Sequence, residues 1–256
     1  MQYTDNSCLF AVMSTAEFRE RKEEFAYKKE MLHSLGSIRY CKAELFKECI
    51  LGTIRLPQKN EQKKAQLSFG FYLTGRKVFF VEDEGKMKAW IEKQTEMFQE
   101  VDTPKQLLLR IMEHMIEEDT LYFSHMESEL DKLEEKISGG TGSNNNFFTS
   151  LIKHRQKLSE FNIYYEQLID IAELFSTCDF YQSEQDTQGW DRFMHRVEQL
   201  QNHVHLLREN VLQIRELYQS MQDAHQNKIM AVITIVTTIF LPLTLITGWY
   251  GMNFVY

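Results

Sequence analysis

The chain has 256 residues, with only 11 glycines and 3 prolines, and it carries a formal net charge of −8 at pH 7. This acidic balance argues against nucleic-acid binding, which selects basic surfaces, and suits a protein that gathers cations. The 4 cysteines form no CxxC pair, so we expect thiols in a reducing compartment rather than a disulfide framework. The N-terminus lacks the basic segment and apolar run of a signal peptide, so we expect the soluble part to stay in the cytoplasm.

Residues 1–100 are predicted to form a cytoplasmic domain that mixes strands with helices. Short apolar runs bounded by turn residues indicate strands, and Thr74-Gly75-Arg76 is predicted to join two of them into a hairpin. Segments with apolar residues at near-helical spacing indicate helices, the first of which should be exposed. The predicted strands are 8–13, 49–56, 67–73 and 77–81, and the predicted helices are 15–31 and 85–99.

The next segment, 103–185, shows a helical pattern only. Thr103 is a good N-cap and Pro104 suits the first helical position, so one helix should run from there to the Gly- and Asn-rich loop at 139–146. A second helix is predicted over about 147–181. Because the loop is short, the two helices should form an antiparallel hairpin.

One last helix is predicted to run from about residue 187 to residue 248, which is about 90 Å at 1.5 Å per residue. Its first part, 187–228, is a stalk, and its second part, 229–250, has no charged residue and can cross a bilayer. A buried core helix is the alternative, but such helices usually keep charges on one side. The stalk has a heptad stripe that should pack on the hairpin or on a neighbouring subunit: Phe193, Val197, Leu200, Val204, Leu207, Val211, Ile214, Tyr218 and Met221. The predicted fold class is therefore α+β.

A second row of residues, here called the polar row, occupies the c and f heptad positions of the same helix. Sites seven apart drift by only about 20° on a straight helix, so the row stays on one side. The alternative is that the part of the row below the membrane is only a solvated face, and that the threonines within the membrane are small residues for helix packing. Continuity across Lys228 favours a pore lining, which several identical chains must enclose, because polar groups inside a membrane face protein or water. The polar row comprises Glu209, Gln213, Glu216, Ser220, Asp223, Asn227, Met230, Thr234, Thr237, Leu241, Thr244 and Gly248.

The end of the chain resembles the CorA family of magnesium channels. Tyr250-Gly251-Met252-Asn253-Phe254 is similar to the family signature, and Asn227-Lys228 through Phe240-Leu241-Pro242-Leu243-Thr244 resembles its first membrane helix. The resemblance covers the last third of the chain, and elsewhere it rests on the order of elements. It implies a homopentamer in the cell (inner) membrane, in contact with lipid, with this helix innermost. It also implies Mg²⁺ as transported and regulatory ion, with no organic cofactor and no nucleic acid.

The resemblance and the polar row together suggest roles along the helix. Gly251, Met252 and Asn253, within an extracellular loop at 251–256, are implied as the selectivity element for an ion that keeps its water shell. Rings of acids at a vestibule concentrate cations, and amide oxygens accept hydrogen bonds from the water of the ion. Asn227 would repeat the amide ring at the inner end, Met230, Ile233 and Leu241 would form the gate, and Glu216 and Asp223 would line the vestibule.

Two departures from the family are visible. The family closes its pore with metal held between cytoplasmic domains, but a gap-free count places Arg192 where it has an acid, so the regulatory metal ligands stay unknown. The family also has a second membrane helix and a basic tail after the signature, whereas this sequence stops at Tyr256. We therefore expect this chain alone to form a poorly stable channel.

No enzymatic motif stands out, so we expect no enzyme. His203 and His205 face about 200° apart on a helix and cannot chelate one ion within a chain. We interpret the acidic run Glu117-Glu118-Asp119 as a solvated helix face. Two alternatives to a magnesium channel remain: a zinc-transporting relative, against which Met252 argues, and a single-span coiled-coil membrane anchor with a cytoplasmic interaction domain.

Overall fold

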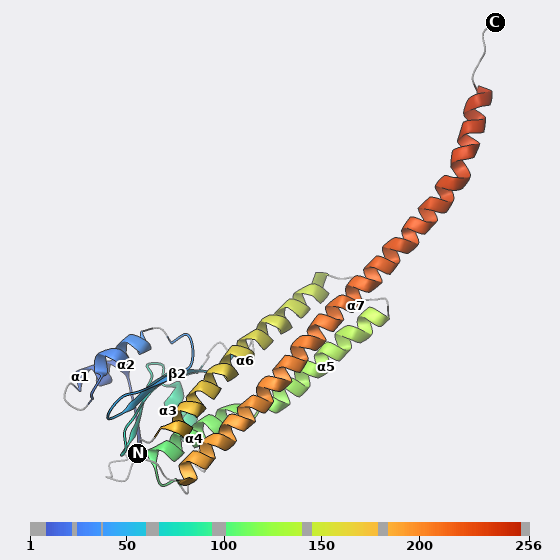
Figure 1. Cartoon of the computed structure of the whole chain (residues 1–256). Helices are drawn as coiled ribbons and strands as arrows, with labels where there is room; N and C mark the ends of the chain where they lie inside the picture. The colour runs from blue at the N-terminus through green and yellow to red at the C-terminus, as the bar shows by residue number, and fades with distance from the viewer. Residues whose placement is uncertain are drawn as a thin grey trace.

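The computed structural model describes residues 9–21, 25–36, 38–59, 67–93, 101–139, 145–178 and 184–251. Its fold is α+β, as predicted, with a small mixed domain beside a helical bundle and one helix that extends far beyond both (Figure 1). The elements are β1 (Phe10–Met13), α1 (Thr15–Glu20), α2 (Lys28–Leu35), β2 (Lys42–Leu45), β3 (Ile50–Arg55), β4 (Ser68–Leu73), β5 (Val78–Val81), α3 (Lys86–Lys93), α4 (Pro104–Ile116), α5 (Asp119–Ser138), α6 (Asn145–Thr177) and α7 (Glu184–Gly251).

Five strands form one sheet in the order β1-β5-β4-β3-β2. The predicted hairpin is confirmed, since β4 and β5 pair antiparallel with Leu73 opposite Val78. β1 pairs parallel to β5, and the other neighbours are antiparallel. β2 was not predicted, because this edge strand is four residues long and carries two charged residues, and only its pairing with β3 makes it a strand.

One face of the sheet is covered by α1 and α2, where one exposed helix over 15–31 had been predicted. That prediction is wrong: α1 ends at Glu20, and α2 begins after Tyr27, whose φ of 57° is left-handed. Between them Phe25 is buried against the sheet, with its ring 5.0 Å from that of Tyr72. A straight helix would carry Phe25 away from this cluster, so burial of the ring decides the break. Phe18 is buried as well.

The opposite face of the sheet packs against the helical bundle through one continuous apolar core. The helix predicted from Thr103 does begin there, since Thr103 Oγ1 accepts a 3.1 Å hydrogen bond from the Gln106 N–H. It was wrongly extended to the loop, because the chain turns at Glu117 and α5 starts as a separate helix. No glycine or proline marks this turn in the sequence. This turn separates α4, which packs against β5 and α7, from α5, which packs alongside α7.

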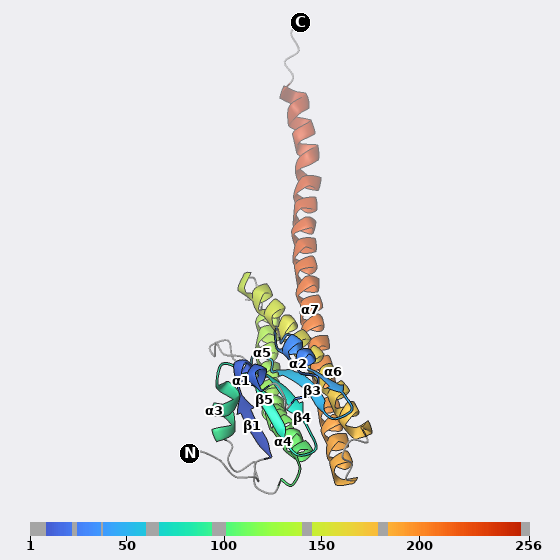
Figure 2. The ribbon, with the colours of Figure 1, turned by 90° about the vertical axis from the view of Figure 1, so that its left-hand side faces the viewer.

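The stalk and the membrane span form one helix of 68 residues, α7, about 100 Å long. Its lower half packs chiefly against α6 and also against α5 and α4, and Figure 2 shows its upper half standing clear of the rest of the chain. The heptad stripe is buried from Phe193 to Ile214. Its partners are therefore the hairpin helices of the same chain, which was one of the two predicted possibilities.

Candidate functional site

The polar row is carried by a helix without a break. α7 runs through Lys228 and through Pro242 to Gly251, so the stalk and the apolar segment keep one helical phase. Eighteen residues separate Glu216 from Thr234, which is about five full turns at 3.6 residues per turn. These two side chains therefore leave the helix in the same direction, although one lies in the stalk and the other in the apolar segment.

The intrachain packing of α7 ends at the ring of Tyr218, which stacks on Phe147 with centroids 5.0 Å apart. From Gln219 to Gly251 every residue is exposed in the single chain. This part includes a helical window long and apolar enough to cross a membrane, and none of that window is buried within the chain. A bare apolar surface of this size needs lipid or other protein around it.

The threonines of the apolar segment have their hydroxyl donors already engaged. Each of these hydroxyls donates to a backbone carbonyl of the same helix, as Thr234 does to Met230 at 2.8 Å and Thr244 does to Phe240 at 2.8 Å. Thr237, Thr238 and Thr247 do the same. A hydroxyl oxygen that has given its proton to the helix still has lone pairs. The outward surface of these threonines is therefore a hydrogen-bond acceptor.

The acids of the polar row in the stalk stand in solvent. Glu209, Glu216 and Asp223 are exposed, and none of them has an ion pair among the described residues. Their charges therefore project outward, and within the described ranges no basic side chain lies at ion-pair distance from them. A single chain holds them in line but encloses no space between them.

The remaining predicted residues are lined up but not brought together by one chain. Met230, Ile233 and Leu241 are exposed, Leu241 by 71%, so a gate would need several copies of α7. Gly251 is the last residue of the helix. Met252 and Asn253, the rest of the predicted selectivity element, lie outside the described residues.

Within the part of the chain that the structure describes, no three His, Cys, Asp or Glu side chains are grouped so that they could hold a metal. His203 packs its ring on Phe123, with centroids 5.7 Å apart. Arg192 donates through Nε to the Gln188 carbonyl of the same helix. The three described cysteines are buried and form no disulfide.

One buried polar cluster, around Asp119, was not predicted from the sequence. Asp119 had been interpreted as part of a solvated face, but it is 1% exposed, and its Oδ1 lies 2.5 Å from Nζ of Lys59. Burial raises the pKa of Asp119, and the nearby charge of Lys59 opposes that rise. No local signal separates Asp119 from its neighbours Glu117 and Glu118, because only the turn between α4 and α5 directs it inward.

These features define a class: an α+β chain in which one continuous helix ends in a segment long and apolar enough to cross a membrane. The family described as CorA-like Mg²⁺ transporter protein matches residues 29–256. The chain therefore belongs to this family, which is one of transporters rather than of enzymes.

The chain is similar to one curated relative in sequence and to one solved structure in fold. Over 66 residues the chain is 41% identical to the cobalt/magnesium transport protein CorA of Thermotoga maritima, and that segment covers 26% of this chain and 18% of the relative. The solved CorA magnesium transporter of Methanocaldococcus jannaschii superposes with a TM-score of 0.81 at 18% identity, covering 100% of this chain and 83% of that one. Sequence similarity to the curated relatives thus spans less than a fifth of their length, whereas the fold matches throughout.

The fold is also similar to that of a second solved protein. The cytoplasmic domain of ZntB from Vibrio parahaemolyticus superposes with a TM-score of 0.65 at 10% identity, covering 84% of this chain and 88% of that one. Both solved proteins therefore share the architecture of the soluble part.

Proposed function

We propose that this chain forms a magnesium channel, a homopentamer in which α7 of each copy lines a central pore in the cell membrane. The observation that carries the proposal is the polar row itself, acidic in the stalk and threonine-rich in the apolar segment, on one unbroken helix. Membership of a Mg²⁺ transporter family supports the choice of ion. The α+β domain would then lie in the cytoplasm, with residues 251–256 on the outer side.

The chemistry of the row suits an ion that keeps its water shell. Mg²⁺ dehydrates reluctantly, and the protons of its bound water point outward. A pathway for this species needs hydrogen-bond acceptors rather than dense carboxylates. The engaged hydroxyls of Thr234, Thr237 and Thr244 offer such acceptor oxygens, and the amides of Asn227 and Asn253 would add more at the two ends.

The same row contains the parts that would control conduction. Glu216 and Asp223 in five copies would form acidic rings that raise the local concentration of cations. Met230, Ile233 and Leu241 would narrow the pore with apolar side chains, which can close it by excluding water. Mg²⁺ inside the cell would act on the gate through the cytoplasmic domains, by ligands that the described residues do not reveal.

Paired cysteine variants test the direction of the row. Residues two apart on a helix face about 200° away from each other, so Thr244→Cys and Ile246→Cys sample opposite sides at one depth. Thr234→Cys and Val236→Cys form a second pair. In membranes, a charged, water-soluble thiol reagent should modify the threonine positions and block Mg²⁺ uptake, while the isoleucine and valine positions react slowly. Equal modification of both members of each pair would overturn the pore assignment.

The alternatives predict different results. A coiled-coil anchor would give a dimer or trimer when the mass of the detergent-solubilised complex is measured, and it would give no uptake. A zinc transporter would take up Zn²⁺ in preference to Mg²⁺ from a mixture. A pentamer that takes up Mg²⁺ supports the channel against both.

A further inference from the structure

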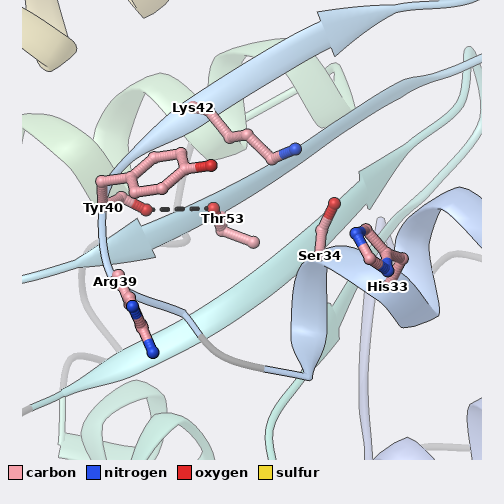
Figure 3. A pocket seen from close by; sticks show the side chains of 6 residues that line it. All are labelled: His33, Ser34, Arg39, Tyr40, Lys42 and Thr53. Atoms are coloured by element: carbon pink, nitrogen blue, oxygen red, sulfur yellow. Dashed lines mark hydrogen bonds between the residues drawn. The ribbon is translucent and has the colours of Figure 1, made fainter.

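A polar pocket opens in the soluble domain between the end of α2 and the edge of the sheet at β2. It has a volume of about 250 Å³ and is lined by His33, Ser34, Arg39, Tyr40, Lys42 and Thr53. Figure 3 shows these side chains arranged around the opening, with Ser34 and His33 on α2 and the others on β2, β3 and the segment before β2. No acidic side chain is among the six, although the chain as a whole is acidic.

The positive charge of this pocket is available to a ligand. Among the described residues the Arg39 guanidinium has neither a hydrogen bond nor an ion pair, and it is exposed. Nζ of Lys42 lies 2.6 Å from Oε1 of Glu44, two residues further along the strand. An ion pair that is this open to solvent is weak, so an anion in the pocket can compete with Glu44 for the lysine.

The wall that carries Arg39 and Tyr40 is held in place from behind. Thr53 is 2% exposed, and its hydroxyl donates to the Tyr40 carbonyl at 3.1 Å. The Cys41 N–H donates to Oε1 of Gln167 on α6 at 2.7 Å. Nη1 of Arg55 donates to the Ile38 carbonyl at 3.4 Å. The backbone on both sides of Arg39 is therefore anchored, which lowers the entropy cost of ordering the site around a ligand.

We propose that this pocket binds a phosphate-bearing small molecule of the cytoplasm. Arg39 and Lys42 bring two positive charges to the lining of one pocket. This charge suits a phosphate group, because a guanidinium can donate to two of its oxygens at once. Tyr40 also lines the pocket, so its hydroxyl can add a neutral donor, and its exposed ring can contact an attached organic group.

The position of the pocket selects a soluble ligand over a lipid headgroup. The pocket lies on α2 and β2, on the side of the bundle away from the free upper half of α7 (Figure 1). A headgroup at the membrane end of α7 is too far away to reach it. The cytoplasmic source of the ligand rests on the orientation proposed above, whereas binding to this pocket does not depend on conduction.

Calorimetric titration of the full chain in detergent tests the site with inorganic phosphate, AMP and adenosine. We expect phosphate and AMP to bind saturably and adenosine not to bind. Arg39→Ala should weaken phosphate binding at least about tenfold, and Arg39→Lys less, because lysine keeps the charge but not the fork. Glu44→Gln should tighten binding about twofold by releasing Lys42. Arg76→Ala, in the exposed turn between β4 and β5, is the matched control and should bind as the wild type does.

Circular dichroism of each variant checks that it folds. Absence of saturable phosphate and AMP binding in the folded wild type up to about 10 mM would overturn the proposal. Equal weakening of phosphate binding by Arg39→Ala and Arg76→Ala would also overturn the proposal, because the binding would then depend on the overall surface charge and not on this pocket. Vesicles that contain anionic lipid test the alternative that the pocket binds a lipid headgroup. The proposal would also be overturned if the chain bound these vesicles but not soluble phosphate, and if Arg39→Ala abolished the vesicle binding.

Discussion

The hydroxyl of Tyr165 donates a 2.6 Å hydrogen bond to Oδ2 of Asp119, at a site where both side chains are buried. The other carboxylate oxygen faces Lys59, which follows β3. Three elements meet here: the start of α5, the middle of α6 and the segment after β3. The cluster connects the sheet to the helical bundle at the turn between α4 and α5. Its loss should therefore lower the free energy of unfolding of the sheet and bundle together.

Tyr165→Phe should lower the free energy of unfolding by about 1–3 kcal/mol, because it leaves one oxygen of a buried carboxylate without a donor. Denaturant unfolding of the soluble part, followed by circular dichroism, measures the change. Tyr164→Phe is the control, since its hydroxyl makes no hydrogen bond within the described chain, and it should cost no more than about 0.5 kcal/mol. Identical midpoints for the two variants would contradict the role of the bond.

The buried carboxyl of Asp119 should also make stability depend on pH. Burial raises its pKa above the ordinary value of 3.8, although Lys59 and Tyr165 act in the opposite direction. The folded chain then holds this proton more tightly than the unfolded chain does. The stability that the fold gains from this tighter proton binding is complete below pH 3.8, and it is lost as the pH rises through the higher pKa of the folded chain.

The unfolding midpoint of the wild type, relative to that of Asp119→Asn, should therefore fall as the pH is raised from about 4 to about 8. Lys59→Met should extend this fall to higher pH, because the lysine charge is what lowers the pKa of Asp119. Midpoints that diverge in the other direction would show that the carboxylate, once ionised, is the favoured form in the folded chain.

Two adjacent leucines of α7 should behave differently. Leu207 is 2% exposed in the bundle core, whereas Leu206 is 64% exposed. Leu207→Ala should cost about 2–5 kcal/mol through lost burial and the cavity left behind. Leu206→Ala should change the stability of the soluble part by no more than about 0.5 kcal/mol. Thermal unfolding of the two variants checks the heptad phase, and a larger loss at Leu206 would contradict it.

Neutralising the acids of the proposed vestibule should slow Mg²⁺ uptake at low ionic strength, where salt does not screen their charges. The double variant Glu216→Gln and Asp223→Asn should reduce the initial rate of Mg²⁺ uptake into liposomes about threefold or more at low ionic strength. The effect should shrink at about 0.15 M salt, where the Debye length is about 8 Å. Glu127→Gln with Glu134→Gln removes the same charge from the exposed surface of α5 and should leave uptake unchanged. An equal loss in both double variants would contradict a vestibule.

Local patterns predicted those parts of the protein that depend on neighbours in sequence. The cap at Thr103, the hairpin of β4 and β5 and the buried stripe from Phe193 to Ile214 all follow from spacing and turn chemistry. The lone apolar segment and its threonines are equally visible. The pocket around Arg39 was not predicted, because its six residues come from α2, the segment before β2, β2 and β3, which only the sheet brings together.

By itself the sequence determined the long helix, its apolar end and the polar row that runs along it, because helical periodicity is written in residue spacing. Only the tertiary structure decided that the chain turns at Glu117, that Phe25 interrupts a helix, and that Asp119 is buried against Tyr165. The physical reason is that burial overrides local preference: a side chain that gains a place in the core stabilises a break which nothing in its own segment requires.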